Sequence, residues 1–142
     1  MIRIQVLNGH PRYRRRHREI MYIVRGVLRG ETRKDADLNI VFIADGRMIR
    51  MNSTFLKHRN TTDVLSFPLS GTNSRTIEGE IYINLDQAQR QAKEYRVSIR
   101  NETARLVIHG VLHLVGYDDR SKRAKARMTR LEDNYLMKYF EG

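Results

Sequence analysis

One segment constrains the fold of this chain more than any other: residues 109–119, with the sequence HGVLHLVGYDD. His109 and His113 stand four residues apart in an apolar run, so on a helix they share one face. Gly116 is a residue type that lets a helix end in a left-handed turn. The chain can then turn back and bring Asp119 to the two imidazoles. The segment predicts a helix and a tight turn that together gather three side chains able to bind a metal ion.

The residue types in this segment favour a catalytic metal site over a structural one. Three protein ligands leave the fourth position of a zinc ion open to water or substrate. The chain has no cysteine, so every ligand must be nitrogen or oxygen, which permits Zn²⁺ and other divalent metals. We predict one ion per chain, held by His109, His113 and Asp119, with a metal-bound water as the reacting group. A lone histidine in such a run is more often a core residue, but the paired spacing favours the metal.

Length and composition limit the number of domains and the class of protein. A chain of 142 residues suits a single domain spanning residues 1–142, large enough to bury a core. It contains no apolar run near the roughly 20 residues that a membrane span needs, and its first residues show no secretory cleavage pattern. The lack of cysteine fits a reducing compartment. We therefore expect a cytoplasmic protein with no membrane partner, and the sequence leaves its oligomeric state open.

The chain is strongly basic, with a formal net charge of +11 and a pI near 10.4. Such a field attracts polyphosphates, of which nucleic acid is the commonest in cells. A basic but inert surface is the plainer alternative. Two groups of basic residues are candidates for contacts with an RNA backbone: Arg12, Arg14, Arg15 and Arg16 in one, and Lys122, Arg123, Lys125 and Arg127 in the other.

Hydrophobic periodicity predicts an α+β fold with four strands and about five helices. Strands are expected at 1–7, 38–44, 64–68 and 80–85, and helices at 12–30, 46–55, 86–95, from 98 through the two histidines, and at 121–140. This order predicts a small mixed sheet packed with a helical half that carries the metal motif. Pro68 ends its strand, which favours an edge or terminal position in the sheet.

Three of the expected helix starts depend on particular side chains. Ser98 is expected to cap the helix that carries the histidines. Asp86 with Gln89 three residues later has the pattern of a capping box. The arginines at 12–18 would place positive charge at a helix N-terminus, which opposes the helix macrodipole. That conflict indicates either a binding role or a frayed first turn.

The spacing of the motif is also similar to the H-E-x-x-H-x-x-G-x-x-H pattern of metzincin proteases, in which aspartate can replace the last histidine. Those enzymes use the glutamate after the first histidine as their general base. This chain has Gly110 there, and glycine cannot take a proton from water. The protease alternative therefore lacks its base.

With glycine at this position, residues 109–119 resemble the H-G-x-L-H-L-x-G-Y-D-H signature of the YbeY family of bacterial endoribonucleases. A second block, Asn52 followed by TDVLSFP at 62–68, is similar to that family's L-N-…-T-D-V-L-S-F-P block. A third, GEIYI at 79–83, is similar to its L-G-D-I-x-I strand. The three blocks come in the family's order, span about residues 50–119, and are followed by a fitting C-terminal helix.

The resemblance implies a zincin-like α+β fold and a metal-dependent hydrolase, usually with zinc. It implies a single-strand-specific endoribonuclease that acts in ribosomal RNA maturation, notably at the 3′ end of small-subunit RNA, and in ribosome quality control. The expected partners are RNA and the small ribosomal subunit. His109 and His113 match the family's first two metal ligands, and Asp119 stands where its third ligand is usually histidine.

Two positions depart from the family's pattern. A carboxylate at Asp119 still ligates zinc, but its charge should make the ion a weaker electrophile and favour harder metals. Leu56 stands where many members have an arginine that is thought to serve activity. His58 is the nearest side chain that could donate to a phosphate, and a solvated loop histidine is the alternative. Asp118 is either a hydrogen-bond acceptor for a ligand histidine or a solvated turn residue.

Hydrolysis by a metal-bound hydroxide is the expected mechanism, and attack by the RNA 2′-OH is the alternative to water. The main rival function is a non-catalytic ribosome-assembly factor with a structural metal. An open fourth ligand position favours the enzyme, whereas the missing arginine favours the rival.

Overall fold

A four-stranded mixed sheet forms the base of the molecule in a computed structural model that describes residues 1–55 and 61–140. The strands are β1 (Ile2–Asn8), β2 (Asp35–Ile43), β3 (Val64–Pro68) and β4 (Thr76–Asn84), in the spatial order β1-β2-β4-β3. β1, β2 and β4 are parallel, and β3 runs antiparallel to β4 at the edge. The edge position predicted for the strand that ends in proline is confirmed.

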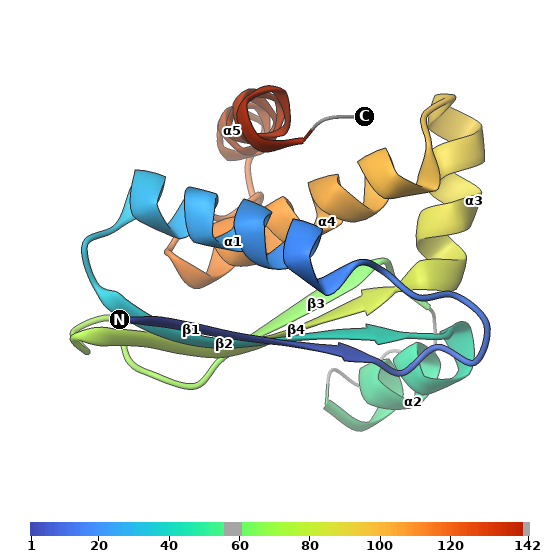
Figure 1. Ribbon diagram of the computed structural model, residues 1–142, viewed down its shortest axis with the longest axis horizontal. Helices are drawn as coiled ribbons and strands as arrows, with labels where there is room; N and C mark the ends of the chain where they lie inside the picture. Colours follow the sequence, from blue (N-terminus) through green and yellow to red (C-terminus); the bar gives the residue numbers. More distant parts are fainter. Residues whose placement is uncertain (56–60, 141–142) are drawn as a thin grey trace.

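Five helices surround this sheet in the described part of the chain: α1 (His17–Glu31), α2 (Asp45–Phe55), α3 (Leu85–Tyr95), α4 (Ile99–Leu114) and α5 (Lys122–Tyr139). α1 and α4 lie across one face of the sheet, and α5 forms an outer layer above them (Figure 1). α2 lies on the opposite face near one end. In the described ranges, no helix combines the length and the apolar character that a membrane span requires.

The core lies between the sheet and the layer of α1 and α4. β2 contributes Leu38, Ile40 and Phe42, which are fully buried. α4 is buried on most of its circumference, because it has the sheet on one side and α5 on the other. Its histidines occupy the one strip that remains partly exposed, which is how the core presents the metal motif.

The predicted order of elements is confirmed, as is the predicted cap at Ser98. The Ser98 hydroxyl accepts from the amide of Asn101 at 3.0 Å and begins α4. The Ser121 hydroxyl does the same for Ala124 at 3.0 Å and begins α5. β2 and β4 begin several residues earlier than expected, because parallel pairing of Asp35 with Thr76 extends both strands.

The predicted start of the first helix is wrong, since α1 begins at His17 and the arginines at 12–16 precede it. Local contacts fold this segment into a loop. The Nδ1 atom of His10 accepts from the amides of Arg12 and Tyr13, both at 3.0 Å, and Asn8 accepts from the amide of Arg15 at 3.2 Å. Arg16 is the N-cap of α1 and Arg18 lies in its first turn, so the unfavourable interaction with the macrodipole that the sequence predicts remains.

The capping box predicted at Asp86 is also wrong. Asn84, at the end of β4, is the N-cap of α3 and accepts from the amides of Asp86 and Gln87. The Asp86 carboxylate instead accepts from the amide of Asp45 at 2.9 Å and lies 2.8 Å from the His10 imidazole. It therefore ties the start of α2 to the loop after β1.

The ionisation of Asp45 makes the stability of the fold depend on pH. Hydrogen bonds from Arg90, opposed by partial burial and reinforced by Asn84 and Thr61, lower the pKa of Asp45 from 3.8 to about 2. A depressed folded-state pKa stabilises the protein above pH 4, and this contribution disappears as pH falls from about 4 to 2. We expect Asp45→Asn to lower the urea midpoint at pH 6, and by roughly half as much at pH 3. An equal loss at both pH values would contradict this assignment.

Candidate metal centre

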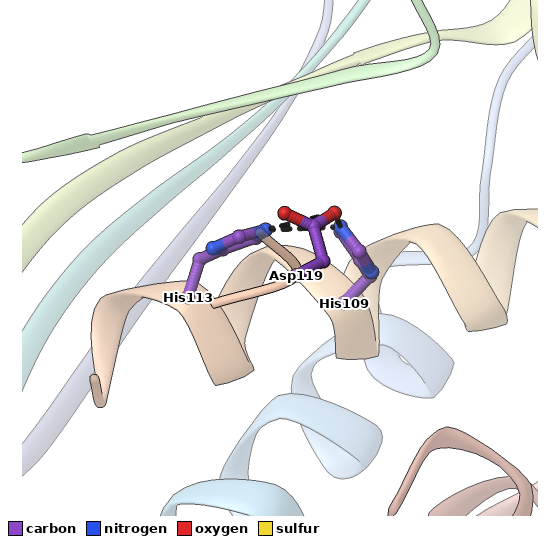
Figure 2. A group of neighbouring side chains, drawn as sticks. All are labelled: His109, His113 and Asp119. Atoms are coloured by element: carbon purple, nitrogen blue, oxygen red, sulfur yellow. Dashed lines mark hydrogen bonds and ion pairs between the residues drawn. The ribbon is translucent and has the colours of Figure 1, made fainter. Parts of the chain in front are cut away.

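Three side chains that the sequence predicts as metal ligands converge beside α4 (Figure 2). The Nε2 atoms of His109 and His113 are 3.1 Å apart. The Oδ2 atom of Asp119 lies 3.7 Å from Nε2 of His109 and 3.9 Å from Nε2 of His113. The imidazoles come from successive turns of the helix, and the carboxylate reaches them from the turn that follows.

These separations fit a divalent ion. In a tetrahedral zinc site the metal–ligand bonds are about 2.0–2.2 Å, so neighbouring donor atoms lie roughly 3.3 Å apart. The observed separations lie on both sides of that value, and small side-chain rotations would equalise them. The donor set also matches zinc, which accepts imidazole nitrogen and carboxylate oxygen. The arrangement leaves space for a fourth ligand from solvent or substrate, since His109 and Asp119 both line open cavities.

The turn after α4 brings the carboxylate into place. Gly116 has φ of 114°, a conformation that favours glycine. The amides of Gly116 and Tyr117 donate to the carbonyls of His113 and Leu112, at 3.1 and 3.0 Å. Farther along, Asp118 accepts from the amide of Arg120 at 3.1 Å and is exposed, so it is the solvated turn residue of the two alternatives.

The position after the first histidine cannot hold a protease base without rearrangement. A Cβ added to Gly110 would come within 2.6 Å of the Cγ2 atom of Ile81, which is fully buried in β4. Position 110 therefore faces the sheet and not the metal-binding strip of α4. The Gly110 carbonyl accepts from the Ser66 hydroxyl at 3.1 Å, which fastens β3 to α4.

Replacing Gly110 by alanine tests this close packing. Overpacking a core costs typically ~1–3 kcal/mol, and the better helix propensity of alanine returns only up to ~1 kcal/mol. We therefore expect Gly110→Ala to destabilise the protein, measured as a lower urea midpoint with an unchanged slope. A midpoint equal to or above that of the wild type would show that the Ile81 side chain can move aside at little cost in stability.

The two imidazoles differ in their surroundings. Burial lowers the pKa of His109, but the hydrogen bond and charge of Glu132, together with Asp119, outweigh it and leave that pKa raised. Burial and the neighbouring His109 lower the pKa of His113. The Nδ1 atom of His109 lies 2.6 Å from Oε2 of Glu132, which comes from α5. Neutral imidazole is the form that binds metals, and a partner on one ring nitrogen decides which other nitrogen is available.

Open cavities flank the three ligands on both sides. A cavity of about 290 Å³ lies toward α3 and α5, and one of about 420 Å³ lies toward β3. Both are lined by Asp63, His109 and Asp119. A third cavity of about 340 Å³ continues past His113 to the loop between β3 and β4. An extended ligand could therefore pass over the site.

The structure treats the two predicted basic groups differently. Lys125 lines the same cavity as Asp119, and Lys122, Arg123 and Arg127 are exposed on the same helix. Among the described residues that line the two cavities at the ligands, none comes from the segment that holds Arg12, Arg14, Arg15 and Arg16. Leu56 and His58 lie outside the described residues.

Glu132 was missed in the sequence, together with Arg105, which binds it at 3.1 Å. A signal did exist: Glu132 follows Met128 by four residues and precedes Tyr135 by three, so it falls on the buried face of α5. A charged residue on the buried face of a helix is rare unless another side chain pairs with it, so Glu132 predicts a partner.

A mixed α/β fold with two histidines and an aspartate gathered on a helix and its following turn is typical of metal-dependent hydrolases. The family model described as endoribonuclease YbeY matches residues 8–140. This chain belongs to that family.

Individual relatives agree with the family match. An endoribonuclease YbeY of Chloroherpeton thalassium is 41% identical over 114 residues, covering 80% of this chain and 79% of the relative. One of Salinibacter ruber is 34% identical and covers 94% and 89%. The solution structure of TM1509 from Thermotoga maritima superposes with a TM-score of 0.66 at 25% identity, covering 98% of this chain and 91% of that one. The resemblance found in the sequence, the fold class and the assignment as a hydrolytic enzyme are confirmed.

Proposed function

We propose that this chain is a metal-dependent endoribonuclease that cuts single-stranded RNA during ribosomal RNA maturation, at the 3′ end of small-subunit RNA, and in ribosome quality control. The observation that carries the proposal is the convergence of His109, His113 and Asp119 beside open cavities in a member of this family. We place the activity in the cytoplasm, where ribosomal RNA is its partner.

His109, His113 and Asp119 are the proposed ligands of one Zn²⁺ ion. When bound, zinc supplies a Lewis acid that polarises a phosphoryl oxygen and makes water a better nucleophile near pH 7. The carboxylate ligand adds a negative charge that a histidine would not, which favours harder divalent metals more than an all-histidine site does. Activity with Mn²⁺ as well as Zn²⁺ is therefore expected of this chain.

The surroundings of the ligands suit an RNA strand. Lys125 and the neighbouring basic residues of α5 offer contacts to backbone phosphates, which position a strand without reading its sequence. The cavities on either side of the ligands allow a strand to continue in both directions. A duplex presents a rigid, wide surface to such a site, whereas an unpaired strand can bend into it.

Cleavage of matched RNAs tests the proposal. Zinc-loaded protein should cut a single-stranded RNA and leave the same sequence intact in a duplex. A chelator should abolish the cleavage, and added Zn²⁺ should restore it. Cyclic phosphate ends on the products would identify the 2′-OH as nucleophile, and simple phosphate ends would identify water. Firm metal binding without cleavage of any single-stranded RNA would overturn the enzyme and favour an assembly factor with a structural metal.

A further inference from the structure

We propose that Glu132 is a positioning residue of the metal centre: it fixes the imidazole of His109 as a ligand, and Arg105 holds Glu132 in place. The inference rests on the proposed metal site and assigns to it two residues outside the sequence motif. It also makes α5 a structural part of the centre, in addition to its basic outer face.

The contact between Glu132 and His109 joins two helices. Oε2 of Glu132 lies 2.6 Å from Nδ1 of His109, and the Glu132 side chain is only 9% exposed. A carboxylate at this distance accepts the Nδ1 proton of a neutral imidazole, which leaves the lone pair on Nε2. Nε2 is the atom that faces His113 and Asp119. Glu132 therefore selects the ring nitrogen that points at the ion position.

Arg105 donates a hydrogen bond to the second oxygen of the buried Glu132 carboxylate. One guanidinium nitrogen donates to Oε1 of Glu132 at 3.1 Å, and another donates to Asp133 at 2.6 Å. Arg105 stands one helical turn before His109 on α4, so both residues reach the same carboxylate on α5. A buried carboxylate without a cation would be costly, and the guanidinium keeps it charged and directed at His109.

The Arg105 guanidinium also lies near the additional negative charge that Asp119 brings to the site. Arg105 lines the cavity that also contains Asp119 and Glu132. With a carboxylate as third ligand and a second carboxylate behind His109, a nearby cation limits the charge that accumulates around the ion. Arg105 is thus expected to matter for metal affinity even though it is not itself a ligand.

Zinc affinity measures the proposal directly, without any RNA. Zn²⁺ would be competed against a chromophoric chelator at one fixed pH for the wild type, Glu132→Gln, Arg105→Gln and Arg105→Lys. Loss of a partner that orients a ligand histidine typically costs about 10–100-fold in metal affinity. We expect Glu132→Gln to lie in that range and Arg105→Gln near its lower end. Arg105→Lys, which keeps the charge but not the fork, should recover part of the loss.

Two controls separate positioning from a general structural role. Glu94→Gln is the same chemical change at an exposed position on α3, and it should leave zinc affinity unchanged. Melting curves with and without Zn²⁺ give the second control, because a bound ion raises Tm according to its affinity. A positioning residue reduces the rise in Tm on adding zinc. A merely structural residue lowers Tm by the same amount in both conditions.

The outcomes distinguish this inference from the proposed function. Glu132→Gln that binds zinc as tightly as the wild type overturns the inference, even if the wild type cleaves RNA in a zinc-dependent manner. Weakened zinc binding in Glu132→Gln supports it, even if no RNA is cut. A wild-type protein that takes up no zinc overturns both.

Discussion

Replacing His113 by alanine is expected to lower metal-dependent RNA cleavage by more than 100-fold. His113 supplies one of three converging donors, and its Nε2 lies 3.1 Å from that of His109. Loss of an outer partner of a metal ligand already costs about 10–100-fold in affinity or activity, so loss of a ligand should cost more. The two donors that remain cannot complete a three-ligand catalytic site.

The substitution should leave the fold intact, which makes the result interpretable. The His113 side chain is 29% exposed, so its truncation leaves no closed cavity in the core. Circular dichroism and the Tm of the metal-free protein should therefore match the wild type. The measurement is the initial rate of cleavage of a labelled single-stranded RNA at equal protein and zinc concentrations. Equal rates for the variant and the wild type would identify a contaminating nuclease and contradict the enzymatic claim.

Neutralising the basic face of α5 is expected to have the second largest effect. This face consists of Lys122, Arg123, Lys125 and Arg127, and replacing all four by glutamine removes four positive charges. For single-stranded nucleic acid, each phosphate contact contributes about 0.7 to the slope of log affinity against log salt. If all four make such contacts, the slope should fall by roughly 3, with a loss of affinity of about 100-fold or more at low salt.

A matched variant of the other basic group provides the comparison. In this variant, glutamine replaces Arg12, Arg14, Arg15 and Arg16. It loses the same charge from a segment that does not line the cavities at the ligands. RNA affinity measured across a salt series should fall further for the α5 variant, because Lys125 shares a cavity with Asp119. The α5 variant should also remain folded, since fewer cations at a helix N-terminus suit the macrodipole. A larger loss in the Arg12–Arg16 variant would place the RNA backbone on that segment instead.

The order of the elements and the three ligands were predictable because their signals are local. Strand alternation and helical periodicity are properties of short windows, and the caps at Ser98 and Ser121 depend on amides three residues away. The ligands fall within residues 109–119, so one helix and one turn are enough to bring them together. Gly116 at positive φ is the residue that the turn requires.

The features that sequence reasoning missed depend on contacts between distant segments. Glu132 contacts His109 only because α5 packs on α4. The local sequence pattern of either helix does not predict that these two helices pack together. Asn84, and not Asp86, caps α3, because the Asp86 carboxylate is already occupied by His10 and the amide of Asp45. The same His10 holds the arginine-rich segment as a loop, which overrides the helical periodicity expected from residue 12. The bonds from the amides of Arg12 and Tyr13 to His10 are local, but the His10 ring is itself held by Asp86 from a distant segment.

Metal content is the most direct test of the central claim that His109, His113 and Asp119 hold one divalent ion. Elemental analysis would compare purified wild-type protein, equilibrated with Zn²⁺ and then dialysed, with a His109→Ala, His113→Ala double variant treated identically. We predict close to one ion per wild-type chain and almost none in the double variant. A wild-type chain that retains no transition metal after loading, or a double variant that retains as much as the wild type, would contradict the claim.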